Sequence, residues 1–130
     1  MKAPHIVLLA VLLAACSGGA PASFEKSSSK PMLSPDYTDI TVPSNIAPLN
    51  FNIGNEADRY ITVFESGSKS LAIKGKQVCI SARKWKALKT NGPINVTVFT
   101  KNDGKWTAMQ PFRIDLSDDI DPFISYRQIM

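Results

Sequence analysis

The chain has few of the residues that carry most enzymatic chemistry. Its 130 residues include one histidine and two cysteines, and the histidine, His5, lies in an apolar leader near the amino terminus. Once that leader is removed, the mature chain has no histidine. Ser-His-Asp and Cys-His nucleophilic pairs, and the commonest zinc ligands, are then excluded. We therefore expect a protein that is not an enzyme and that holds no cofactor or metal.

Glutamate is also scarce, with only Glu25, Glu56 and Glu65 in the whole chain. A glycosidase needs two carboxyl groups that face each other across a cleft. Glu56 falls in a polar loop and Glu65 at the end of an expected strand, so nothing in the pattern places them in one pocket. Hydrolysis of glycosidic bonds is accordingly disfavoured.

The densest group of acids is Asp118, Asp119 and Asp121. Carboxylate oxygens are the ligands that calcium and magnesium prefer, so a metal site is one interpretation. No glycine follows Asp121, however, and no glutamate completes an EF-hand loop. We interpret the three acids as solvated turn residues before Pro122.

No apolar run is long enough to cross a membrane. The longest, Ile6 to Ala15, has ten residues, whereas a spanning helix needs about 20. Lys2 precedes this run, and Leu13-Ala14-Ala15-Cys16 ends it, followed by Ser-Gly-Gly. That order is typical of a secretory signal that closes on a lipobox. We predict a lipoprotein signal peptide over residues 1–15 and a diacylglyceryl (palmitate-bearing) cysteine at Cys16; an ordinary secretory signal with a chance cysteine is the alternative.

Lipidation of Cys16 would decide where the protein lies. Stable attachment takes two acyl chains or more, because each buried methylene contributes only about 0.8 kcal/mol. Ser17 at the second mature position is not an aspartate-type signal for retention at the inner membrane. We therefore expect an anchor in the outer membrane, on its periplasmic or surface face. The membrane, through this lipid, is the first expected partner.

The second cysteine, Cys79, would then be the only thiol of the mature chain. No internal disulfide is available, and a lone exposed thiol is a liability in an oxidising envelope. We expect Cys79 to be at least partly shielded. The net charge of +4 falls to +3 when Lys2 is lost, which is too small to indicate nucleic-acid binding.

Residues 16–35 predict a lipidated, flexible tether. They are rich in serine, glycine and proline, and Phe24, Met32 and Leu33 are the only sizeable apolar residues. Such a segment buries too little surface to offset its ordering entropy. A flexible coil of this length spans roughly 20–25 Å, enough to hold a domain clear of the headgroups.

Residues 36–130 predict a single all-β domain. Short runs with period-two alternation, separated by turn residues, are typical of a β-sandwich. We expect an immunoglobulin-like sandwich of about seven short strands, at Leu49–Ile53, Tyr60–Glu65, Leu71–Ile73, Val78–Ile80, Ile94–Phe99, Trp106–Met109 and Phe112–Leu116. Asp103-Gly104 supplies the turn of a hairpin. Pro111 marks an edge, a bulge or a change of sheet.

One segment, Arg83 to Lys89, predicts a short helical turn. Ser81 can cap its start, and Trp85 and Leu88 share one face. Asn91-Gly92 ends the helix, and the proline that follows prevents its continuation.

Two groups of side chains could bind a partner. The first is a basic group that could contact anionic lipid headgroups or acidic glycans, although solubility and protection of strand edges explain it equally well. The second is a set of aromatic residues that could line a carbohydrate-binding or protein-binding surface, or fill the core. The basic group is Lys69, Lys74, Lys76, Arg83, Lys84, Lys86 and Lys89, and the aromatic set is Trp85, Trp106, Tyr60 and Phe99.

Three segments carry a family resemblance: Tyr37 to Phe51, Lys84-Trp85-Lys86, and Asp121-Pro-Phe-Ile-Ser-Tyr-Arg127. Together they resemble the amino-terminal region of bacterial TolB-like β-propeller lipoproteins. The resemblance implies a β-sandwich-like module that follows the lipid anchor. Longer relatives add a Cys-x-x-Cys-His haem-type motif and a propeller, and this chain contains neither, so no functional residue is carried over.

These observations predict a lipid-anchored lipoprotein of the cell envelope that acts as a non-enzymatic interaction or scaffold module. Its partner would be an envelope protein or a glycan, and not a nucleic acid. One alternative is the truncated amino-terminal part of a TolB-like propeller or c-type haem envelope protein. The other is a glycan-binding surface lipoprotein.

Overall fold

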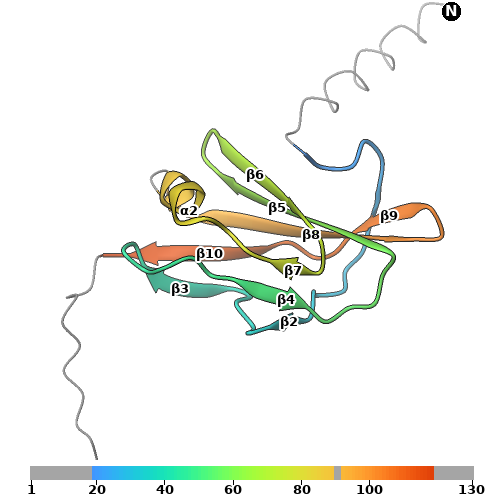
Figure 1. Cartoon of the computed structure of the whole chain (residues 1–130), viewed down its shortest axis with the longest axis horizontal. Helices are drawn as coiled ribbons and strands as arrows, with labels where there is room; N and C mark the ends of the chain where they lie inside the picture. The colour runs from blue at the N-terminus through green and yellow to red at the C-terminus, as the bar shows by residue number, and fades with distance from the viewer. Residues whose placement is uncertain (1–18, 90–91, 119–130) are drawn as a thin grey trace, which may run out of the picture.

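The computed structural model describes residues 19–89 and 92–118, and within them nearly all of the regular secondary structure is β-strand (Figure 1). The all-β prediction with one short helix is confirmed. The seven expected strands are all present, and three further strands, at Glu25–Lys26, Leu33–Ser34 and Ile40–Pro43, were not predicted. The elements are β1 (Glu25–Lys26), β2 (Leu33–Ser34), β3 (Ile40–Pro43), β4 (Phe51–Ile53), β5 (Arg59–Ser66), β6 (Lys69–Lys74), β7 (Gln77–Val78), α2 (Ala82–Lys89), β8 (Ile94–Asn102), β9 (Lys105–Ala108) and β10 (Phe112–Ser117).

The strands form two sheets that pack face to face as a sandwich. In the larger, seven-stranded sheet, β8 lies between β5 and the consecutive strands β9 and β10, and β6 continues the sheet beyond β5. Strand β1 pairs with β9 and β3 with β10, both in parallel. The smaller sheet has the order β2-β4-β7. The ring of Phe51 in β4 lies 6.3 Å from that of Phe64 in β5, so the two sheets share one core.

The core follows the predicted alternation. Ile94, Val96 and Val98 are fully buried, as are Phe51 and Ile53 within a few per cent, while the residues between Phe51 and Ile53 and between Ile94 and Val96 are exposed. Alternate side chains of a strand point to opposite faces. One face of each sheet therefore supplies the apolar layer that joins them.

Helix α2 covers one end of this core, as its sequence predicts. The Ser81 hydroxyl accepts a hydrogen bond from the Lys84 N–H at 3.3 Å, which is N-cap geometry. Trp85 and Leu88 are buried, at 1% and 2% exposed. The Trp85 indole N–H donates to the carbonyl of Ile46 at 2.9 Å, so the polar edge of the ring has a partner inside the protein.

The turn and the break in the β8–β9–β10 region also match the sequence. Asp103 and Gly104 have positive φ angles of 52° and 77° in a two-residue loop, the geometry of a type I′ hairpin turn. Ala108 faces Phe99 and Phe112 faces Val96, so the β9–β10 side advances four residues while β8 advances three. The extra residue is a bulge beside Pro111, which has no N–H for the ladder.

Residues 19–35 differ from the prediction, because the tether expected there is in part folded onto the domain. Strand β1 pairs with β9, and Ser27 N–H donates to the Ala108 carbonyl at 2.8 Å. The Phe24 ring meets that of Phe99 edge-on, with centroids 5.0 Å apart. We call Gly19–Ser27 the strap. Its composition predicts flexibility, but a single aromatic ring and a few backbone hydrogen bonds to an apolar sheet face hold it in place.

Strand β2 extends the same correction, because Leu33 and Ser34 pair with Ile53 and Asn52 of β4. The folded part of the chain thus includes residues that the sequence assigns to the tether.

Cys79 is a second correction. The expectation of a shielded thiol is wrong, since Cys79 is exposed. It lies between Val78 and Ile80, which are both buried, so the strand alternation turns its side chain outward. Strand β7, which directly precedes Cys79, is an edge strand of the smaller sheet within the described part of the chain.

Several predicted features lie outside the described residues. These are the signal peptide over residues 1–15, Cys16, and the acids Asp119 and Asp121. Asp118 is described and is exposed just after β10. Within residues 19–89 and 92–118, no helix is long and apolar enough to cross a membrane.

Thr62 provides a test of the core. Its side chain is fully buried on β5, and within the described part of the chain its hydroxyl oxygen has no hydrogen-bond partner. An unpaired buried hydroxyl costs about 1–3 kcal/mol. Thr62→Val keeps a similar shape, and we expect it to raise the free energy of unfolding by about 1 kcal/mol.

Urea denaturation of Thr62→Val beside Thr41→Val, an exposed strand position on β3, measures this difference. The control should change stability by less than about 0.5 kcal/mol. A loss of stability in Thr62→Val would show that the hydroxyl is satisfied in solution.

Candidate functional site

A groove opens beside the β8–β9 hairpin. That hairpin lies at the end of the sandwich opposite helix α2 (Figure 1). The volume of the groove is about 490 Å³. The residues that line it come from β5, from the β6–β7 turn and from β9. They are Asp58, Arg59, Tyr60, Ile61, Lys74, Gly75, Lys76 and Trp106.

Strand register brings the groove residues together from distant parts of the chain. Arg59 lies opposite Lys101 across β5 and β8, and Lys101 lies opposite Trp106 across β8 and β9. Residues directly opposite each other in an antiparallel pair point to the same face. These three side chains therefore form one row across the sheet. Lys74 lies opposite Ile61 in the next row.

Both rows belong to the face of the larger sheet that points away from the core, which we call the outer face. Its centre is apolar: Val63, Phe99 and Ala108 form a buried cluster separate from the core cluster, with Ile61, Ala72, Trp106 and Ala20 of the strap packed against it. The groove lies at the end of this apolar centre, where the cationic residues begin.

The electrostatics of the groove are mainly positive. The exposed side chains of Arg59 and Lys74 carry full charges, and the Lys101 ammonium lies over the Trp106 ring at 5.7 Å from its centroid. Such a cation–π contact is worth about 0.5–1 kcal/mol at an exposed site. Asp58 is the one acid in the lining. This combination of fixed cations and a half-buried indole fits an anionic ligand.

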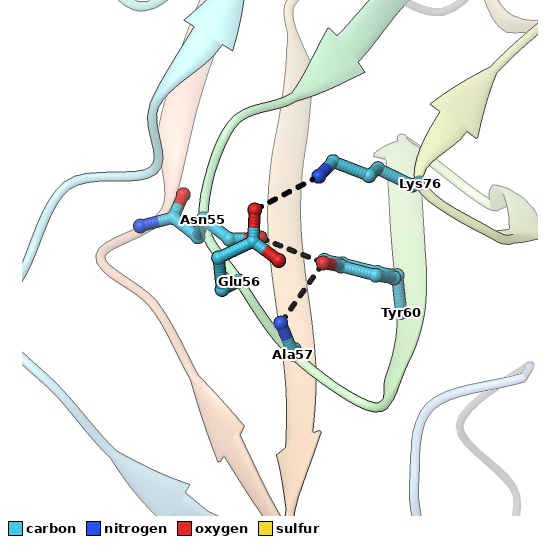
Figure 2. A network of polar contacts seen from close by, with 5 residues as sticks. All are labelled: Asn55, Glu56, Ala57, Tyr60 and Lys76. Atoms are coloured by element: carbon cyan, nitrogen blue, oxygen red, sulfur yellow. Dashed lines mark hydrogen bonds and ion pairs between the residues drawn. The ribbon is translucent and has the colours of Figure 1, made fainter.

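A polar network holds the loop beside the groove in place (Figure 2). The Tyr60 hydroxyl donates to the carbonyl of Asn55 at 2.7 Å and accepts from the N–H of Ala57 at 2.9 Å. The Asn55 side chain in turn accepts from the Met32 N–H at 2.8 Å. Figure 2 also shows the Lys76–Glu56 ion pair, at 3.3 Å. Tyr60 thus connects the loop to β5 from inside the sandwich.

The structure separates the residues that the sequence proposes for binding. Trp85 is buried beneath α2 and cannot form a binding surface, and Tyr60 and Phe99 are also buried. Trp106 is half-buried and reaches the groove. Of the basic group, Lys74 and Lys76 line the groove. Arg83, Lys84, Lys86 and Lys89 lie on or at the start of α2 at the other end.

The sequence analysis does not include Arg59, which lines the groove, or Lys101, which lies beside it in the same row. Each lies at the end of a long strand and outside the basic group around residues 69–89. Their alternation with Tyr60 and Thr100, which point inward, was the available signal. It becomes informative only once β5 and β8 are known to be neighbours.

A second cavity, of about 550 Å³, lies beside α2. The most prominent donors there are already used, because the Trp85 indole and the Lys89 ammonium both donate to the carbonyl of Ile46 at 2.9 Å. This geometry braces the helix against the Ser44–Pro48 loop. We therefore take the groove beside Trp106 as the candidate site.

The acids do not converge on either cavity. Glu56 pairs with Lys76, whereas Glu65 lines a different hollow with Thr97 and Phe99. In the described ranges, no group of three or more His, Cys, Asp or Glu side chains could hold a metal ion. Asp36, whose pKa is lowered by hydrogen bonds from the Thr38 hydroxyl and N–H, does not line the groove.

No protein-family model, no curated protein and no solved structure matches this chain. The resemblance to TolB-like lipoproteins therefore stays a prediction.

The Tyr60 network predicts a clear contrast between two neighbouring substitutions. Tyr60→Phe removes two hydrogen bonds and leaves a part-buried N–H and a part-buried carbonyl without their partner, so we expect a loss of about 1–2 kcal/mol. Lys76→Ala removes an ion pair whose side chains are 48% and 91% exposed. Exposed pairs contribute little, and we expect a loss below about 0.5 kcal/mol.

Urea unfolding of the two variants, compared at equal m-values, measures both effects. Equal losses in the two variants would contradict the role assigned to the Tyr60 hydroxyl.

Proposed function

We propose that this protein is a lipid-anchored lipoprotein of the cell envelope that works as a non-enzymatic interaction or scaffold module. The observation that carries the proposal is the sequence Leu13-Ala14-Ala15-Cys16 at the end of a ten-residue apolar run. Small residues followed directly by a cysteine suit cleavage of the signal peptide before Cys16 and formation of a thioether on the Cys16 sulfur. The position of Ser17 supports an anchor in the outer membrane, with the folded domain on its periplasmic or surface face.

A binding role agrees with the chemistry of the groove. Arg59, Lys74 and Trp106 supply positive charge and an aromatic surface, which suit the recognition of an anionic ligand. The only histidine of the chain is in the predicted signal. The groove is thus better suited to holding an anionic group than to transforming it.

Acylation is the direct test of the anchor. We expect wild-type protein, expressed in a bacterium that processes lipoproteins, to incorporate a palmitate probe and to partition with membranes. Cys16→Ala should lose the label, because no other side chain can form the thioether at that position. Cys79→Ser is the matched control, since it removes the exposed second thiol and should keep the label. Wild-type protein that carries no acyl mass and stays in the aqueous fraction would overturn the proposal.

A second candidate function, binding of an acidic glycan, is favoured by one observation. Trp106 is half-buried in a groove that also contains Arg59 and Lys74, and an aromatic face beside cations suits a uronate-containing sugar. Trp85, by contrast, is 1% exposed and is not available for it.

Tryptophan fluorescence tests this candidate. Acidic uronate oligosaccharides should change the emission of the wild type, and Trp106→Phe, which keeps the buried Trp85, should show no response. An unchanged emission of the wild type at saturating sugar would exclude a glycan in this groove.

A further inference from the structure

The strap fixes how far the folded domain can lie from the proposed anchor. Gly19 packs so closely against Ala72 of β6 that a Cβ at this position would collide with the Ala72 side chain. Its φ of 91° is also a conformation that favours glycine. Cys16 precedes Gly19 by three residues, and a fully extended chain covers at most about 3.6 Å per residue. A lipidated Cys16 would therefore lie within roughly 11 Å of Gly19 on the outer face.

This reach from Gly19 to Cys16 is much shorter than the tether that the sequence predicts over residues 16–35. A coil over residues 16–35 would hold the domain clear of the headgroups, but the strap uses most of that length on the sheet itself. A bilayer that holds the acyl chains must then be close to the outer face and to the β5–β6 side of the larger sheet.

The outer face has the apolar character expected of such a surface. The strap covers only part of its apolar centre, and a hollow of about 410 Å³ remains between the strap and the sheet. Phe24 and Phe99 both line this hollow, and Phe24 is 40% exposed although its ring packs on Phe99. Large aromatic rings at the rim of an apolar face are favourable at a membrane interface.

The charges of the outer face are distributed unevenly along β5. Arg59, at the start of the strand, adjoins Lys101 and is one row from Lys74. Glu65, which is exposed near the other end of β5, is six residues further on, about 20 Å along an extended strand. Further acids near this face, among the described residues, are Glu25 in β1, Asp58 before β5, and Asp103 in the β8–β9 turn, whose N–H donates to the Asp58 carboxylate. The cations thus dominate the end that contains the groove.

We infer that the outer face lies against the bilayer that holds the anchor, with Arg59, Lys74 and Lys101 on the phosphates of anionic phospholipids. Phe24 and Trp106 reach the headgroup level, and the smaller sheet points away from the membrane. This inference rests on the proposed lipid anchor at Cys16. The positive charge and the short reach from Gly19 favour a phospholipid surface over a soluble glycan as the occupant of the groove.

Tryptophan quenching in vesicles tests the orientation. Acylated full-length protein, its lipid confirmed by intact mass, is reconstituted into phosphatidylcholine vesicles or into an equal mixture with phosphatidylglycerol, with brominated acyl chains in both. Bromine quenches only a nearby indole. We expect quenching in the mixed vesicles that disappears in Trp106→Phe, because the remaining Trp85 is in the core.

Paired charge variants test the role of the cations. Each basic side chain near an anionic surface contributes about 1 kcal/mol, or roughly fivefold. Arg59→Gln with Lys74→Gln should lower the equilibrium constant for the membrane-facing orientation about 25-fold and weaken the dependence of quenching on phosphatidylglycerol. Lys84→Gln with Lys86→Gln changes the charge equally on α2, at the other end of the molecule (Figure 1), and should keep it.

The exposed Cys79, next to the smaller sheet, allows an independent measurement on the side of the domain that is expected to point away from the membrane. A spin label there should be accessible to a water-soluble relaxation agent and inaccessible to oxygen dissolved in the bilayer. Acylated protein in which Trp106 is not quenched, or in which the Cys79 label is the membrane-embedded site, would overturn the inference. So would a response of Trp106 to acidic oligosaccharides with no response to brominated lipid. Protein without acyl mass would instead overturn the proposed anchor.

Discussion

The pairing of β5 with β8 is the constraint on which the rest of the structure depends. The two strands pair over seven residues, from Arg59 with Lys101 to Glu65 with Asn95. Because successive side chains alternate between faces, this register sends Thr62, Phe64 and Val98 into the sandwich and Ile61, Val63 and Phe99 to the outer face. A slip by one residue would exchange the two sets. Both sets are largely apolar, so both faces of the larger sheet need cover.

The two faces are covered by different means. The smaller sheet and α2 cover the inner face. Phe51, Val78 and Trp85 from these elements belong to the same continuous core as the inner face of the larger sheet. Among the described residues, the strap covers the outer face, and it is held by the Phe24–Phe99 contact, the short β1–β9 pairing and the close approach of Gly19 to Ala72. An apolar face with such thin cover is typical of an interaction surface. The strap therefore determines which face of the folded domain lies near the proposed anchor.

The same register creates the groove. Every antiparallel pairing at this end of the sheet places a cation on the outer face, so Arg59, Lys101 and Lys74 meet although they lie on three different strands. Tyr60, which alternates with Arg59, points inward and holds the Asn55–Ala57 loop with its hydroxyl. Strand β5 thus supplies one cation of the groove, Arg59, and the support of its wall, Tyr60. This arrangement allows the charge to be changed at Arg59 without disturbing the network at Tyr60.

Local sequence determined the elements. Alternation in Leu49–Ile53 and Ile94–Val98, the Ser81 cap, and the Asp103-Gly104 turn each depend on neighbouring residues, and each was predicted correctly. Only the tertiary structure decided which strands are neighbours, and three results depended on that: the assembly of Arg59, Lys101 and Trp106, the exposure of Cys79 at a sheet edge, and the docking of the strap. Apolar periodicity indicates that a side chain is buried, but it does not identify the residues that pack against that side chain. The serine- and glycine-rich strap has almost no periodicity, and a sheet face remote in sequence supplies the surface that orders it.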